Sequence, residues 1–158
     1  MIRETLTELM LIPGLSGHEE RVAKAIASHL DRLAIQHRSD RLGNLIATLP
    51  GDPALPSVMV FAHMDQLGFI VRKVEATGLI RLERLGGVPE RALSAQAVVL
   101  CTDKGEVNGV IANKSHHATA PEEKYRVLPY AELYVDAGFT SAAEAEAAGV
   151  LIGTPITY

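Results

Sequence analysis

The spacing of apolar residues over the first part of the chain predicts two helices. Residues 2–11 repeat apolar side chains at helical intervals, and the segment "IPGLSG" then interrupts the pattern. A second amphipathic helix is predicted from Ser16 to Leu33. Ser16 and Glu19 have the spacing of a capping box, in which both side chains bind backbone amides at the start of a helix. The chain therefore begins with two predicted amphipathic helices, each with an apolar face.

Three strand-like segments follow these helices. Residues 34–40 and 45–49 read as short strands on either side of the turn "RLGN", with Asp40 placed to cap that turn. After a loop rich in Pro and Gly, residues 57–61, "SVMVF", form a continuous apolar run. Such a run is typical of a strand that is buried on both faces. Helices followed by a buried strand predict the first part of an α/β domain.

The pattern changes after residue 66, where short alternating runs are separated by turn residues. The segments "FIVRKV" and "LIRLERL" flank "EATG", and "AVVLCT" and "EVNGVIA" flank "DKG", so we expect two hairpins. The segment "ELYVDAG" is a further strand, and "ITY" at 156–158 looks like the start of another, unfinished one. Between them lies an Ala-rich helix with a capping box from Ser141 to Glu144 and a stop at Gly149.

These patterns predict two domains with a boundary near residue 66. Residues 1–66 are expected to be the N-terminal part of an α/β domain, a partial sheet with helices. Residues 67–158 are expected to form a small all-β domain, either a barrel or a sandwich.

Composition narrows the classes of protein that fit. Of the 158 residues, 47% are hydrophobic, and the formal net charge of −4 comes without a basic cluster, which argues against nucleic acid as a partner. The N-terminus lacks the apolar region of a signal peptide, and no apolar run is long enough to cross a membrane. The single Cys101 cannot form an internal disulfide. We therefore expect a soluble, cytoplasmic protein.

His63 and Asp65 are the strongest candidates for chemistry. They follow the apolar run at 57–61, and in an α/β sheet the carboxyl ends of strands are where ligands bind. Two residues apart on an extended chain, the side chains point the same way, so the carboxylate can orient the imidazole, as it commonly does for histidines that bind metals. Two alternatives stay open at this point: a metal ligand at the mouth of a sheet, or a buried histidine satisfied by hydrogen bonds.

The other histidines are weaker candidates. His116 and His117 are adjacent, so on an extended chain they point to opposite faces, and a solvated or hydrogen-bonded loop pair is the better interpretation. His18, predicted in the first turn of a helix, and His29, on the same helix, are interpreted as structural. The sequence has no Gly-rich phosphate loop, no Gly-x-Ser-x-Gly elbow and no pair of cysteines.

A set of ordered segments resembles the M42 family of metallo-aminopeptidases, which includes the tetrahedral aminopeptidases and the FrvX-like and SgcX-like proteins. In chain order these segments are "LIPGLSGHEE", "DRLGNLIA", "VMVFAHMDQLGFIV", "GLIRLERLGGV", "GEVNGVIANKSHH", "ELYVDAGFTSAAEAEAAGV" and "IGTPITY". They run along the whole chain, and "AHMDQLGF" is the most diagnostic.

The resemblance implies an α/β metallopeptidase domain interrupted by a β-barrel lid that also takes part in oligomer contacts. It implies two divalent metal ions, zinc or cobalt, with His63 as a metal ligand and Asp65 as the catalytic-site residue that orients it. The substrate would be a peptide, read at its free amino end, and the protein would be a homo-oligomer.

The chain is about half as long as members of this family, whose remaining metal ligands and general base lie after the lid. By resemblance it is the N-terminal portion of such an enzyme, which alone would bind metal weakly or not at all and be inactive, because a zinc site needs three or four protein ligands. Residues 1–66 would expose apolar surface and need a partner. The alternative function is a non-catalytic assembly or regulatory module derived from such an enzyme.

Overall fold

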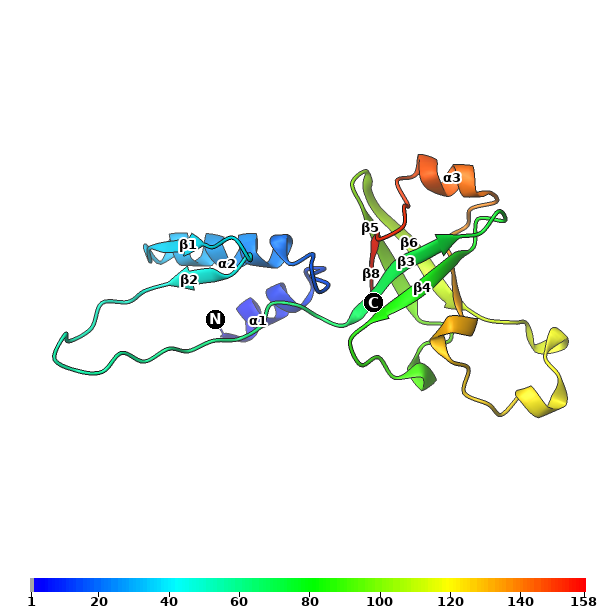
Figure 1. The fold of residues 1–158 in the computed structure, drawn as a ribbon, viewed down its shortest axis with the longest axis horizontal. Helices are drawn as coiled ribbons and strands as arrows, with labels where there is room; N and C mark the ends of the chain where they lie inside the picture. Colours follow the sequence, from blue (N-terminus) through cyan, green and yellow to red (C-terminus); the bar gives the residue numbers. More distant parts are fainter. Residues whose placement is uncertain (1) are drawn as a thin grey trace. The chain divides into compact units, whose positions relative to one another are not determined.

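The computed structural model describes residues 2–158, which divide into two compact units between Gln66 and Leu67. We call residues 2–66 the helical unit and residues 67–158 the barrel unit. Each is described by itself (Figure 1).

The helical unit contains two helices and one hairpin. Helix α1 spans Ile2–Met10 and α2 spans Glu20–Arg32, while β1 (His37–Ser39) pairs antiparallel with β2 (Leu45–Ala47). Asp40 holds the hairpin turn, as predicted: its Oδ1 accepts hydrogen bonds from the amides of Leu42 at 2.9 Å and Asn44 at 3.0 Å. Asn44 also donates its side-chain amide to Asp40 Oδ2 at 2.8 Å.

The prediction of a buried strand at residues 57–61 is wrong. These residues form no strand, and Val58, Met59, Val60 and Phe61 are 83–92% exposed. A strand that is apolar on both faces needs neighbours for its backbone hydrogen bonds and layers over both faces, and residues 2–66 supply neither. Among the described residues of this unit, the buried apolar side chains are those of Leu15 and Val22. The helical unit therefore leaves many of its large apolar side chains exposed to solvent.

The barrel unit is a closed barrel with the strand order β3-β4-β7-β6-β5-β8. All neighbouring pairs are antiparallel. Its strands are β3 (Gly68–Val74), β4 (Ile80–Leu85), β5 (Ala97–Thr102), β6 (Gly105–Ala112), β7 (Tyr134–Asp136) and β8 (Pro155–Thr157). Helix α3 (Ala142–Ala147) lies between β7 and β8, and short 3₁₀ turns occur at Glu90–Ala92, His116–Ala118, Pro121–Glu123 and Tyr130–Glu132.

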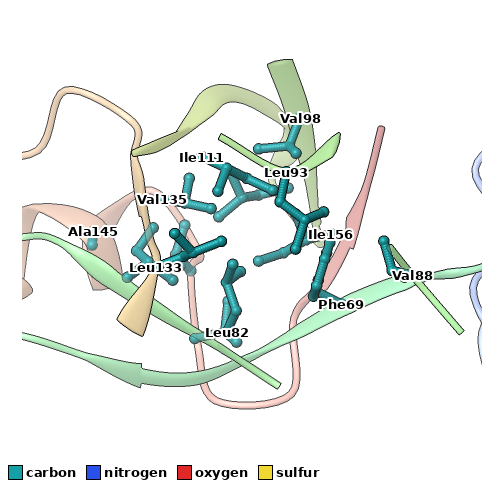
Figure 2. Packing of buried hydrophobic residues seen from close by; sticks show 14 residues of the cluster. Phe69, Leu82, Val88, Leu93, Val98, Ile111, Leu133, Val135, Ala145 and Ile156 are labelled. Atoms are coloured by element: carbon teal, nitrogen blue, oxygen red, sulfur yellow. The ribbon is translucent and has the colours of Figure 1, made fainter. Parts of the chain in front are cut away.

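The interior of the barrel is a packed apolar core. Alternate residues of the strands point inward, as Figure 2 shows for Phe69, Leu82, Val98 and Ile156, and each of these is at most 2% exposed. Ile111 and Val135, which are partners across β6 and β7, belong to the same core. This unit has the core that the helical unit lacks.

Several local predictions for the barrel unit are confirmed. Both hairpins form, and the amide of Glu144 donates to the Ser141 hydroxyl at 3.2 Å, which caps α3. The reciprocal half of the capping box is shifted by one residue, because the Glu144 carboxylate accepts from the amide of Thr140 at 2.8 Å.

The segment at 156–158 does contribute to a strand, β8. Strand β8 pairs with β3 on one side and with β5 on the other, and so closes the barrel. The predicted fold class, α/β elements plus a small barrel, is confirmed. No helix within residues 2–158 is long and apolar enough to span a bilayer.

Candidate metal-ligand site at His63

His63 lies in a short segment that lines a groove of the helical unit. Residues 62–65, helix α2 and the β1–β2 hairpin surround this groove, which has a volume of about 960 Å³. The side chain of His63 is 85% exposed, and that of Asp65 is 35% exposed. The alternative of a histidine buried in the interior is therefore wrong for His63, although the predicted strand that would deliver it is absent.

The imidazole of His63 is held at one nitrogen by Asp65. Nδ1 lies 3.0 Å from the backbone oxygen of Asp65 and 3.0 Å from the carboxylate oxygen Oδ1 of the same residue. Both partners are acceptors, so Nδ1 must carry a hydrogen to bind them. In the neutral ring, Nε2 then keeps its lone pair, which is the form in which imidazole binds a metal or accepts a proton.

The second oxygen of the Asp65 carboxylate accepts a hydrogen bond from the hydroxyl of Ser16. This hydrogen bond is the largest cause of a lowered pKa of Asp65, with the charge of His63 acting in the same direction and burial opposing it. The carboxylate is thus kept ionised, and each of its two oxygens has a different partner.

The predicted capping box between Ser16 and Glu19 does not form. Helix α2 begins at Glu20, its N-cap Glu19 makes no capping bond with its side chain, and the Glu19 carboxylate accepts instead from the amide of Gly17 at 2.8 Å. His18 accordingly precedes the helix rather than lying in its first turn. Ser16 is the site residue that sequence reasoning misses, because its partner lies 49 positions away and no local pattern signals the pair.

Close backbone packing brings Ser16 to Asp65. The amide of Gln66 donates to the carbonyl of Gly14 at 2.8 Å, and Leu15 forms a parallel bridge with Gln66. Leu15 is 1% exposed, and a Cβ atom on Gly14 would lie 2.5 Å from Cγ2 of Val22. Only glycine permits so close an approach to α2, so the sequence "GLS" is fastened both to the helix and to the segment that carries Asp65.

The described residues do not complete a metal site. Glu19 and Glu20 line the same groove as His63, but no three His, Cys, Asp or Glu side chains within residues 2–158 gather closely enough to hold an ion. The donor chemistry of His63 fits one position of a metal centre. The remaining ligands would have to come from outside this part of the chain.

Three of the other histidines have contacts near them in sequence or on the neighbouring helix. His116 and His117 are exposed on a 3₁₀ turn, with ring centroids 5.8 Å apart and planes inclined by 78°, as expected for a solvated loop pair. His29 on α2 contacts Glu8 at 3.0 Å and Arg32 at 2.6 Å, as a structural residue would.

Comparison with known proteins shows the family of the chain. The sequence profile of the M42 glutamyl aminopeptidases matches residues 43–158. The chain belongs to the M42 family. The resemblance seen in its ordered segments is thereby confirmed.

Three M42 relatives show how much of a family member the chain represents. It is 38% identical to SgcX of Escherichia coli (strain K12) over 157 residues, which are 99% of this chain and 42% of SgcX. A TET aminopeptidase from a marine sediment archaeon of the Thaumarchaeota superposes with a TM-score of 0.91 at 33% identity, over 98% of this chain and 44% of that one.

The third relative is the TET1 peptidase of Pyrococcus horikoshii, which can assemble into a tetrahedron or a large octahedral shell. Its TM-score is 0.89 at 29% identity, and the match covers 100% of this chain and 46% of that one. The chain thus spans less than half the length of each M42 protein compared.

Proposed function

We propose that this chain is the N-terminal portion of a metal-dependent aminopeptidase of the M42 type, to which it contributes His63 as a metal ligand. The observation that carries the proposal is the exposed imidazole whose Nδ1 is engaged by two acceptors of Asp65, which leaves Nε2 free. Asp65 has the role of orienting this ring. The peptide substrate would be bound at its free amino end.

The metal centre of the proposed enzyme would hold two divalent ions, zinc or cobalt, which when bound would polarise a scissile carbonyl and lower the pKa of bound water. His63 supplies one neutral nitrogen ligand to it, and Asp65 fixes the tautomer and supports the basicity of that nitrogen. A structural or catalytic zinc needs at least three protein ligands, so this chain alone is expected to bind metal weakly and to have no peptidase activity.

The exposed apolar surface of the helical unit supports the proposal that further chain completes the domain. Val58, Met59, Val60 and Phe61 lie directly before His63 in sequence and are at least 83% exposed. A run of this kind becomes stable when neighbouring strands and covering helices bury it. Burial of this run would fix the backbone that enters His63.

The barrel unit is proposed to act as a lid and as a contact in a homo-oligomer. It has a complete core of its own, yet it exposes Tyr125 (96%), Ile152 (78%) and Leu151 (53%) on its surface. Large apolar side chains that remain exposed beside a well-formed core are candidates for contacts between subunits. The assembly of TET1 into closed shells supports a similar role here.

A hybrid enzyme tests the proposed function. Residues 1–158 replace the matching 46% of the P. horikoshii TET1 peptidase, and release of N-terminal residues from short peptides is measured with and without added zinc or cobalt. We expect metal-dependent release that His63→Ala abolishes, and assembly into a closed shell by native mass spectrometry. His117→Ala is the matched control, because His117 is an exposed histidine of the barrel unit.

Full activity in the His63→Ala hybrid would reject the assigned role of His63. A hybrid that assembles but neither takes up metal nor cleaves peptides would favour the alternative of a non-catalytic assembly or regulatory module.

A further inference from the structure

The hydroxyl of Ser16 donates a hydrogen bond to the side chain of Asp65. Among the described residues, this is the only hydrogen bond that joins residues 14–16 to that side chain. Asp65 uses Oδ2 for Ser16 and Oδ1 for His63, so the carboxylate is fixed at both ends. It is 35% exposed, and water can therefore compete for either oxygen once one of these partners is removed. The rotation of the Asp65 carboxylate about its side-chain bond therefore depends on the hydrogen bond from Ser16.

Ser16 is itself well anchored, although its own side chain is not fully buried. Its neighbour Leu15 is buried, and the carbonyl of Gly14 accepts from the amide of Gln66, which follows Asp65 directly. The two segments are thus held in register by backbone contacts on one side of the Ser16–Asp65 pair. The hydroxyl does not cap α2, whose N-cap position is occupied by Glu19, and it donates to Asp65 instead.

We propose that Ser16 is a positioning residue for the site: it fixes the rotation of the Asp65 carboxylate, which keeps His63 in the Nδ1–H tautomer with Nε2 presented outward. The consequence for metal binding rests on the proposed function, but the tautomer of His63 does not. Residues separated by 49 positions therefore act together to set the state of one imidazole nitrogen.

The test measures the tautomer directly in the 158-residue chain without metal. Long-range ¹H–¹⁵N correlation spectra of the histidine rings, recorded at a pH at which the ring is neutral, distinguish Nδ1–H from Nε2–H. We expect His63 to be mainly in the Nδ1–H form in the unmodified chain. Ser16→Ala should lower the ratio of Nδ1–H to Nε2–H at least twofold, whereas Ser28→Ala, which removes a hydroxyl bonded to Lys24 on α2, should not change it.

A pair of isosteric variants separates the hydroxyl from the fold. Ser16→Thr keeps the hydroxyl and Ser16→Val replaces it with a methyl group, so Thr should keep the original ratio and Val should lose it. Hydrogen exchange of the Gln66 amide shows whether the backbone contact to Gly14 survives in each variant. If Ser16→Ala disturbs that contact, the difference in tautomer ratio between Ser16→Thr and Ser16→Val shows whether the hydroxyl sets the tautomer.

Equal ratios in the Thr and Val variants, or a wild-type ring without an excess of Nδ1–H, would overturn the proposal. In the hybrid enzyme, Ser16→Ala should also weaken metal affinity about 10- to 100-fold, as loss of a residue that orients a ligand commonly does. If Ser16→Ala changes the tautomer but the His63→Ala hybrid stays active, the role of Ser16 is supported and His63 is rejected as a metal ligand. If Ser16→Ala leaves the tautomer unchanged but His63→Ala abolishes activity, the role of Ser16 is rejected and His63 is supported as a metal ligand.

Discussion

Phe69 on β3 lies directly opposite Ile156 on β8, and neither side chain is exposed to solvent. Ile156 is also the partner of Leu100 on β5. Strand β8 has three residues, so few backbone hydrogen bonds are available to hold it. Barrel closure therefore depends on the burial of Ile156 between the two neighbouring strands.

Replacement of Ile156 by alanine should destabilise the barrel unit by about 2–5 kcal/mol, because it removes buried methyl groups and leaves a cavity. Urea unfolding followed by circular dichroism measures the change. Ile152→Ala is the control, since Ile152 is 78% exposed, and its effect should stay within about 0.5 kcal/mol. Equal losses in the two variants would show that β8 does not close the core as described.

The turn between β3 and β4 should not accept a side chain at Gly78. Its φ is +87°, and an added Cβ would lie 2.5 Å from the carbonyl oxygen of Phe139. Gly78→Ala should therefore destabilise the barrel by more than the roughly 1–2 kcal/mol that a left-handed conformation costs alone. Gly87→Ala, with open space and no positive φ, should leave the urea midpoint unchanged or slightly raised. A midpoint for Gly78→Ala that matches this control would contradict the turn geometry.

Asp40 should make the stability of the β1–β2 hairpin depend on pH. The side-chain hydrogen bond from Asn44, together with the backbone amides of Leu42 and Asn44, lowers the pKa of Asp40 below that of an ordinary aspartate. The ionised Asp40 carboxylate therefore stabilises the hairpin fully at a pH above the pKa that Asp40 has in the unfolded chain. This stabilisation is lost as the pH falls through the lower pKa of Asp40 in the folded chain.

Asn44→Ala should raise the pKa of Asp40 toward its usual value, which an NMR titration of the Asp40 carboxyl carbon measures. Asn113→Ala is the control, because its side chain donates to Ser94 instead. An identical midpoint in the Asn44→Ala variant would show that this hydrogen bond is not formed in solution.

The exposed run at 57–61 should make the isolated chain self-associate. Val58 and Val60 are 87% and 92% exposed, and apolar strand-like segments without partners pair with other chains. The double variant Val58→Lys/Val60→Lys should shift sedimentation profiles toward the monomer. Gly51→Lys/Ala54→Lys adds the same charge in the preceding loop and should shift them less. Equal shifts would mean that net charge, and not the apolar run, governs association.

Local signals explain which parts of the fold could be predicted from the sequence. The β3–β4 turn ends at a glycine with positive φ, and Ser141 caps α3 through the amide three residues on, so both features depend on neighbours along the chain. The hairpins of the barrel unit follow from the same short-range rules. Closure of the barrel by β8 joins strands distant in sequence, and the pattern alone left a sandwich equally open.

Contacts between distant residues explain what was missed. Ser16 has the right spacing to cap a helix with Glu19, but its hydroxyl instead binds a carboxylate 49 positions away. The apolar run at 57–61 has the composition of a buried strand. Such a segment forms a strand only when neighbouring strands pair with it and pack against its side chains. For His63 and Asp65, the spacing predicted the contact between the side chains, while the strand expected to carry them is not formed.

The pairing of β3 with β8 has an entropic consequence. The 92 residues from Leu67 to Tyr158 begin and end on adjacent strands, about 5 Å apart. In a longer polypeptide, the folded barrel would therefore act as a connection of only a few residues. Loop-closure scaling makes it about 3 kcal/mol easier to bring the flanking segments together than across an unfolded linker of the same length. A barrel that folds early would thus speed the assembly of whatever it joins.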